Sequence, residues 1–238
     1  MEGPFGAAEV TTGRLNAVDV LHVSRHGEGH ARLSSSVDHR ANVWALRELG
    51  ARSVLAVTVC GAVDPRLPLG GLVVFDDLHF PANRLPDGSP CTLHPEPGDP
   101  LRGHWVFGRP FSAALRAALL YGAREAGHVV LDGGCYGHVD GPRFNTRTEV
   151  RQLAGAGVTA VSQTAGPEAV LCGEAELPYA LLGYATDYAN GVTQQPTPAA
   201  ELLRLIGEST ATFAAVLSKA LPRIAHGNVA AVGTMLRF

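Results

Sequence analysis

Residues 158–187 read VTAVSQTAGPEAVLCGEAELPYALLGYATD. The apolar runs Val158–Ser162 and Tyr179–Thr186 each predict a buried strand, and Pro167–Cys172 between them predicts a short helix. The chain shows no internal repeat and no long linker. Because strands and helices alternate in the same way on both sides of this stretch, the sequence predicts one α/β domain over residues 1–238, with a mostly parallel sheet.

The remaining elements extend this alternation outward from residues 158–187. Further strands are predicted at Ala17–Val23, Ser53–Thr58, Gly71–Phe75 and His128–Leu131, and further helices at Asp38–Leu49, Pro110–Ala126, Thr146–Ala154 and Pro198–Leu221. Asp38 is a plausible N-cap for its helix, which Gly50 ends. Residues 76–110 are rich in Pro and Gly and have no clear period, which predicts an ordered surface excursion.

Composition excludes several classes of protein. Hydrophobic residues make up 46% and charged residues 17%, which excludes a disordered chain. No apolar run is long enough for a membrane span, and the first residues lack the pattern of a signal peptide. A net charge of −3 and a single lysine, Lys219, argue against a nucleic-acid partner. The cysteines form no CxxC pair and predict buried thiols of a cytoplasmic protein: Cys60, Cys91, Cys135 and Cys172.

Two loops that come after predicted strands carry donors suited to an anion. Ligands of open α/β sheets bind at the carboxyl ends of the strands. The loop Ser24–His30 places Arg25 and His26 beside glycines, and the guanidinium offers a fork of donors to an oxyanion. The segment Thr58–Ala62 ends a strand with a hydroxyl and free backbone N–H groups. The alternatives are a solvated charged loop and a structural threonine.

Two further loops suit a flat ligand and an acid. Phe144 comes after a Gly-Pro turn beside an amide and could stack on a planar ring, although a Phe before a helix is often part of the core. Asp187 comes directly after an apolar strand, and burial there favours a raised pKa and acid catalysis, although it could instead cap a turn. No serine nucleophile elbow, P-loop or HExxH motif occurs, and no histidines pair at metal-ligand spacing, so we expect no catalytic metal.

Taken together, several segments resemble the trimeric purine nucleoside phosphorylase family, most closely its 5′-methylthioadenosine phosphorylase branch. They occur in family order and are Arg25–Gly27, Val37–Leu46, Thr58–Gly61, Gly141–Phe144, Pro167–Ala169 and Ala185–Tyr188. The resemblance implies a single α/β domain with a central mixed, barrel-like sheet flanked by helices, assembled as a homotrimer. It also implies cleavage of a purine–ribose bond by inorganic phosphate as co-substrate, without a cofactor.

The resemblance further implies roles for matching positions. Those around phosphate are Arg25, His26, Thr58 and Thr164; those that hold the purine are Phe144, Asn145 and Asp187; and Gln163 lies beside the ribose. His104 is similar to a histidine that reaches into a neighbouring subunit's 5′ pocket, where Pro198 and Leu202 would form an apolar wall. In this scheme a protonated Asp187 neutralises the departing purine at N7.

Three departures from the family pattern bear on the reaction. The segment Gly3–Gly6 resembles the residues that come after the family's first strand and Gly-rich phosphate turn, so we expect these two features to be missing. A misassigned start, a truncated chain and a real loss are the alternatives, and a real loss would weaken phosphate binding and expose a sheet edge. Gln163 stands where the family usually has methionine, and Ala189 stands where 6-aminopurine enzymes usually place a second acid. The Ala-x-Gly pattern at 189–191 resembles the 6-oxopurine branch, but a carboxylate at Asp187 favours a 6-amino group as donor.

Three functions therefore stay open from the sequence. The leading hypothesis is phosphorolysis of a purine nucleoside, such as 5′-methylthioadenosine, to purine and a ribose 1-phosphate derivative. The second is a nucleoside hydrolase in which water replaces phosphate. The third is a catalytically silent protein that binds a nucleoside. Retention of Arg25, His26, Thr58, Thr164 and Asp187 together argues against the third, because a silent protein needs neither an anion site nor an acid.

Overall fold

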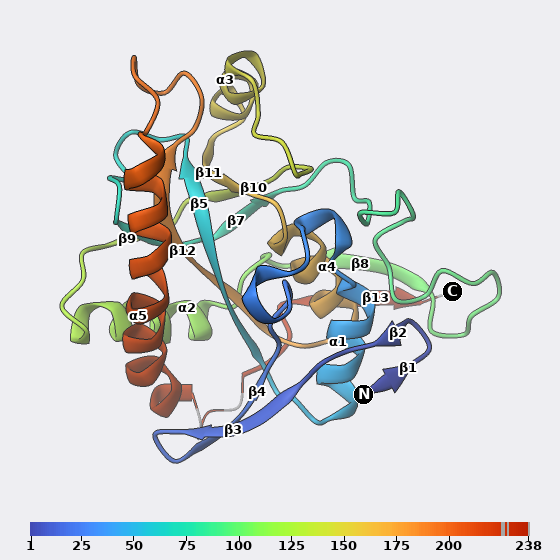
Figure 1. Cartoon of the computed structure of the whole chain (residues 1–238). Helices are drawn as coiled ribbons and strands as arrows, with labels where there is room; N and C mark the ends of the chain where they lie inside the picture. The colour runs from blue at the N-terminus through green and yellow to red at the C-terminus, as the bar shows by residue number, and fades with distance from the viewer. Residues whose placement is uncertain (225–226, 228, 238) are drawn as a thin grey trace.

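Strand β12 lies inside a seven-stranded sheet, next to the central strand β5, in the computed structural model, which describes residues 1–224, 227 and 229–237 (Figure 1). The order across the sheet is β7 (Asp77–His79), β10 (Cys135–His138), β11 (Val158–Ser162), β5 (Val54–Ala62), β12 (Tyr179–Tyr188), β6 (Leu72–Val74) and β9 (Val130–Asp132). Four of the six neighbouring pairs are parallel, whereas β11–β5 and β12–β6 are antiparallel. The sheet is therefore mixed, as the family resemblance implies.

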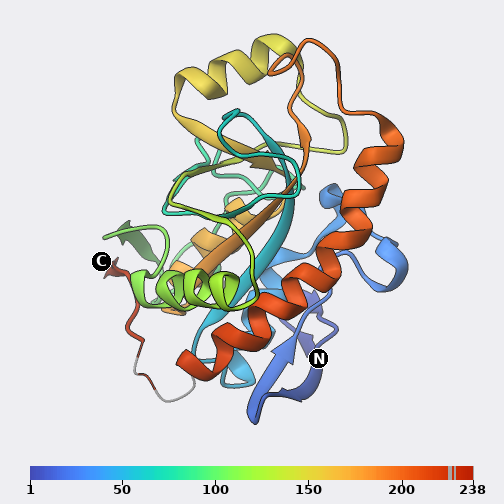
Figure 2. The ribbon, with the colours of Figure 1, turned by 90° about the vertical axis from the view of Figure 1, so that its left-hand side faces the viewer.

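Helices cover both faces of this sheet. In the described part of the chain they are α1 (His39–Glu48), α2 (Ala113–Glu125), α3 (Arg147–Gly155), α4 (Ala165–Glu174) and α5 (Ala199–Ile224). Helix α5 runs along one side together with α2, whereas α1 and α4 lie on the opposite side (Figures 1 and 2). All of the helices predicted from the sequence are present.

Strand β12 is apolar along its length because helices cover both faces of the sheet, and its side chains are buried on each face. Leu182 and Tyr184 face the cluster formed with α2 and α5, whereas Tyr179 and Leu181 face the cluster formed with α4. A strand buried on both faces has no alternation of polar and apolar residues, which explains the continuous apolar run in the sequence.

Local sequence signals set the starts of two helices. The Asp38 carboxylate accepts a hydrogen bond from the backbone N–H of Ala41 at 3.1 Å, which confirms Asp38 as the N-cap of α1. Thr146 and Glu149 form a capping box at the start of α3. These caps satisfy backbone N–H groups that the first turn of a helix leaves without partners.

The excursion at residues 76–110 contains strands that its sequence does not predict. Strand β8 (Gly103–Phe107) pairs with β13 (Gly233–Arg237), and β7 lies at the edge of the main sheet. Strand β10 was also missed. These strands have three to five residues, and their partners lie far away in the sequence, so no local period marks them.

One long edge of β5 has no strand partner in the described part of the chain. Strand β12 pairs with β5 along its whole length, but β11 pairs with it only at Gly61 and Ala62. The hairpin of β3 (Thr11–Leu15) and β4 (Val18–His22) forms a separate two-stranded sheet, as does the pair β1 (Glu2–Gly3) and β2 (Gly6–Ala7). A cavity lies between β4 and the open edge of β5.

Candidate active site

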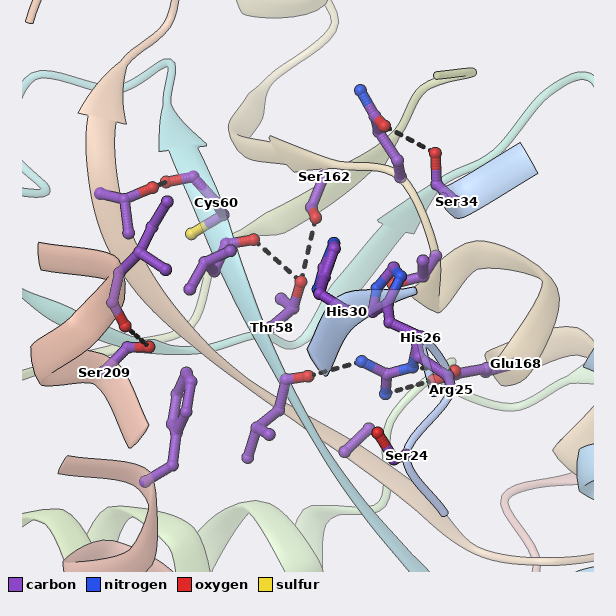
Figure 3. A pocket seen from close by; sticks show the side chains of 18 of the residues that line it. Ser24, Arg25, His26, His30, Ser34, Thr58, Cys60, Ser162, Glu168 and Ser209 are labelled. Carbon is purple, nitrogen blue, oxygen red and sulfur yellow. Dashed lines mark hydrogen bonds and ion pairs between the residues drawn. The ribbon is translucent and has the colours of Figure 1, made fainter. Parts of the chain in front are cut away.

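A cavity of about 1040 Å³ gathers most of the residues singled out in the sequence. Its walls come from the end of β4, the edge of β5, helices α1 and α5, and the loops after β10 and β11 (Figure 3). Eight of the nine predicted site residues line it: Arg25, His26, Thr58, Phe144, Asn145, Gln163, Thr164 and Asp187. Segments far apart in the chain thus meet around one space.

Arg25 forms the buried cationic part of the site. Its Nε and one terminal nitrogen donate to the two carboxylate oxygens of Glu168 at 2.5 and 3.0 Å, and its other terminal nitrogen donates to the carbonyl of Val57 at 2.9 Å (Figure 3). Burial alone would lower the pKa of Arg25, but the charge and hydrogen bonds of Glu168 together with the neighbouring Tyr179 and Tyr136 outweigh it, and the net shift of the pKa is upward. The guanidinium stays charged, and two of its five N–H groups have no partner among the described residues and can bind a ligand.

Glu168 is the residue of this site that sequence reasoning missed. It lies in the first turn of α4 and also accepts a hydrogen bond from the hydroxyl of Tyr179 at 3.0 Å. The side chains of Arg25 and Glu168 are only 17% and 13% exposed, so the pair holds two charges largely out of water. The available signal was an acid inside the otherwise apolar segment 165–172, within a motif already noted for the family resemblance.

His26 presents a neutral imidazole to the same region. Its Nδ1 lies 2.9 Å from the carbonyl of Arg32, and because a carbonyl only accepts, Nδ1 carries the proton and Nε2 is an acceptor. Burial lowers the pKa of His26, and its ring stacks on His30 with centroids 4.2 Å apart. The neutral ring can therefore accept a hydrogen bond at Nε2 from an O–H or N–H group of a ligand.

Hydroxyl groups and the N-terminus of α4 complete the end of the cavity that contains Arg25, which we call the anion-binding end. Thr58 is buried; its Oγ1 donates to the carbonyl of Val59 at 2.9 Å and lies 2.9 Å from Oγ of Ser162. Thr164 is also buried and occupies the N-cap position of α4, with no hydrogen bond from its side chain to the helix. The dipole of a helix favours an anion at its N-terminus, although here the backbone N–H groups of Thr164 and Ala165 donate to the hydroxyl of Tyr136 at 3.4 and 3.1 Å.

Asp187 lies at the other end of the cavity, where no cationic side chain of the described residues pairs with it. Its carboxyl group accepts a hydrogen bond from the hydroxyl of Thr186 at 3.0 Å. Burial raises the pKa of Asp187 above its ordinary value, and this hydrogen bond only partly opposes the shift. A Cβ atom at Gly61 would lie 3.2 Å from Oδ2, so glycine leaves room for the carboxyl group.

The loop before α3 brings an aromatic ring and an amide to the mouth of the cavity. Phe144 is 61% exposed, and its ring therefore has a face open to a planar ligand. The carbonyl of Asn145 accepts a hydrogen bond from the side chain of Asn190 at 2.7 Å, which ties this loop to the segment after β12. The alternative that Phe144 belongs to the core is wrong.

His104 is the one predicted site residue outside the cavity of this chain. It lies on β8, which pairs with β13 on the far side of α4 (Figure 1). Of the predicted apolar wall, Leu202 lines the cavity and Pro198 does not. Within one chain, therefore, neither His104 nor Pro198 contributes to this cavity.

The described residues show neither a metal-binding cluster nor a membrane span. No group of three or more His, Cys, Asp or Glu side chains is arranged to hold a metal ion in that part of the chain. Within the same residues, no helix is long and apolar enough to cross a membrane. The cysteines are free thiols, three of them buried and Cys135 half-buried.

Comparison with known proteins identifies the family of this chain. The model of the phosphorylase superfamily matches residues 2–222. The chain belongs to this superfamily. The resemblance drawn from the sequence is thereby confirmed at the level of the family.

Individual relatives within the phosphorylase superfamily carry names from two branches. A probable 6-oxopurine nucleoside phosphorylase from Thermococcus kodakarensis is 33% identical over 94% of this chain and 84% of its own length. An S-methyl-5′-thioadenosine phosphorylase from Mycobacterium tuberculosis is 36% identical over 93% of this chain and 80% of its own length. The structure of methylthioadenosine phosphorylase from Schistosoma mansoni in complex with tubercidin superposes with a TM-score of 0.83 at 27% identity, covering 95% of this chain and 85% of that one.

Proposed function

We propose that this phosphorylase-superfamily enzyme cleaves a purine nucleoside with inorganic phosphate, releasing the free purine and a ribose 1-phosphate derivative. The observation that carries the proposal is the polarity of the cavity. A buried guanidinium, a neutral imidazole and the N-terminus of α4 line one end, whereas a buried carboxyl group with a raised pKa lies at the other. An anion and a weakly basic leaving group would occupy these two ends.

The reaction assigns a step to each end of the cavity. Breaking the glycosidic bond leaves positive charge on the ribose and negative charge on the departing purine. A protonated Asp187 would donate its proton to the purine at N7, a general-acid contribution of about 10²–10⁴-fold. Phosphate held by Arg25, His26, Thr58 and Thr164 would stabilise the sugar cation and then bond to its anomeric carbon.

The purine would lie between Phe144, Asn145 and Asp187, with Gln163 at the ribose. We propose a 6-aminopurine with a modified 5′ position, such as 5′-methylthioadenosine. While one oxygen of protonated Asp187 donates to N7, its other oxygen can accept from an exocyclic amine, which a 6-oxo group does not offer. The apolar side of α5 that faces the cavity, including Leu202, Ile206 and Phe213, supports an apolar 5′ substituent.

Hydrolysis is the second candidate, and one observation favours it. Glu168 already neutralises Arg25, and Thr58 and Ser162 bond to protein groups, so phosphate would have to compete for these donors. A water nucleophile is neutral and does not need these donors. The two candidates share the role of Asp187 and differ only in the nucleophile.

We further propose a cytoplasmic homotrimer whose subunits share their active sites. Exposed apolar side chains gather around the β8–β13 ribbon that carries His104, among them Val106, Phe107 and Leu236. Free thiols fit a reducing compartment. Light scattering should give the mass of a trimer, and a fully active monomer at low concentration would contradict this assembly.

Product analysis with a panel of nucleosides tests the proposed activity. Adenosine, inosine, 5′-methylthioadenosine and 5′-methylthioinosine are each incubated with enzyme and phosphate, and the released base is measured by chromatography. We expect the highest kcat/KM for 5′-methylthioadenosine. Release of base from none of the four would leave the nucleoside-binding, silent alternative.

A further inference from the structure

Gln163 joins two segments that lie far apart in the sequence. It comes directly after the last residue of β11, and its Oε1 accepts a hydrogen bond from Oγ of Ser34 at 2.7 Å (Figure 3). Its Nε2 donates to the backbone carbonyl of Arg143 at 3.2 Å. Since a carbonyl only accepts, the bond to Arg143 fixes which end of the amide faces which partner.

The loop at 141–145 lies directly on this pair. A Cβ atom at Gly141 would collide with both Oε1 of Gln163 and Oγ of Ser34, so only glycine permits the approach. Ser34 itself is buried, at 8% exposure, whereas most of the loop is exposed. The pair of buried Ser34 and half-buried Gln163 therefore forms the support for the first half of the loop.

Other contacts hold the second half of the loop and the exposed side chain of Arg143. Asn190 bonds to the carbonyl of Asn145, and the capping box fixes Thr146 to Glu149. Arg143 forms a bidentate ion pair with Glu149 at 2.9 and 2.7 Å and also donates to the carbonyl of Phe144 at 3.2 Å, but the Arg143 side chain is 63% exposed, so water weakens these bonds. Phe144 lies between the two halves, and the position of its exposed ring depends on both supports.

We propose that Gln163 is a positioning residue that, together with Ser34, holds the 141–145 loop so that Phe144 lies over the nucleoside. The inference rests on the proposed function for its ligand, but the support of the loop is a property of the chain alone. An amide fits this place because it must accept from a hydroxyl and donate to a carbonyl at once. A carboxylate would keep the first bond and repel the carbonyl of Arg143, and a thioether would lose both.

The test combines Gln163→Met, Ser34→Ala and the double variant, with Ser35→Ala as the matched control because Ser35 is an exposed neighbouring serine. Each lost hydrogen bond should raise the nucleoside KM by about five-fold. The KM for phosphate should stay unchanged. In the double variant, Ser34→Ala should add nothing to Gln163→Met, because its partner is already gone.

Backbone amide exchange supplies a readout that does not depend on activity. Exchange at residues 143–145 should become faster in Gln163→Met and Ser34→Ala, and not in Ser35→Ala. Unchanged exchange and unchanged nucleoside KM in both variants would overturn the inference, and if Gln163→Met does not fold, Ser34→Ala alone decides. A wild-type enzyme that cleaves no nucleoside would overturn the proposed function, while the exchange data would still decide whether Gln163 supports the loop.

Discussion

At one end of the cavity Arg25 is buried against Glu168, and at the other Asp187 is buried beside the hydroxyl of Thr186. Both groups have lost water, but only the guanidinium has gained a partner of opposite charge among the described residues. Burial without a counter-ion favours the uncharged form of a carboxyl group, whereas the carboxylate of Glu168 keeps the guanidinium charged.

The difference shows how one cavity supports two kinds of chemistry. A permanently charged group binds and stabilises, but it does not exchange protons at neutral pH. A carboxyl group with a raised pKa can give up and recover a proton during each turnover. Single substitutions can alter one end of the cavity and leave the other intact.

The largest effect is expected at the purine end. Asp187→Asn keeps the size of the side chain and removes the transferable proton, so kcat should fall by about 10²–10⁴-fold. An amide can still bond the purine edge, so the nucleoside KM should change little. Steady-state kinetics on the best nucleoside measures both, and wild-type turnover would show that Asp187 is not the acid.

A smaller effect is expected at the anion-binding end of the cavity, which contains Arg25. Arg25→Lys keeps the charge but loses the fork that contacts Glu168 and a ligand together, and the loss of one charge-assisted bond should raise the phosphate KM roughly 10- to 100-fold. The nucleoside KM should stay near that of the wild type. Arg66→Lys, at an exposed ion pair with Asp64, is the matched control. Equal phosphate KM values for the two variants would remove Arg25 from the phosphate site.

The smallest effect concerns stability and pH. Because the pKa of Asp187 is raised by folding, its protonated form stabilises the folded state below its ordinary pKa, and this contribution is lost as the pH rises through the raised pKa. Asp187→Asn carries no charge, so it should have a higher Tm than wild type at neutral pH, with the difference vanishing in acid. Thermal unfolding across pH tests this, with exposed Asp140→Asn as control. A lower Tm at neutral pH would contradict a desolvated carboxylate.

The sequence predicted the parts of the fold that have strong local signals. Strand β11 matches its predicted bounds Val158–Ser162, and Asp38 caps α1 as expected. Strands β8 and β10 were missed because they are short and acquire their hydrogen bonds from distant partners. The predicted excursion at residues 76–110 is ordered, but it contributes strands to two sheets.

The site was predicted as single residues and not as pairs. Arg25 and Asp187 were found because each comes after a predicted apolar strand and matches a family pattern. The structure brings them to one cavity, although Asp187 lies within β12, which extends two residues beyond its predicted end. Their surroundings could not be predicted: Glu168 lies 143 residues from Arg25, and Ser34 lies 129 residues from Gln163. Which side chains pair across such sequence separations depends on how the whole sheet packs.

The identity of the sugar product tests the central claim most directly. The purified enzyme is incubated with its best nucleoside across a titration of phosphate, and the sugar is identified as the 1-phosphate or the free ribose. We predict that a ribose 1-phosphate derivative forms in stoichiometric amount with the purine, at a rate that saturates with phosphate. Free sugar released at one rate at every phosphate concentration, with no phosphorylated sugar, would contradict phosphorolysis and establish hydrolysis.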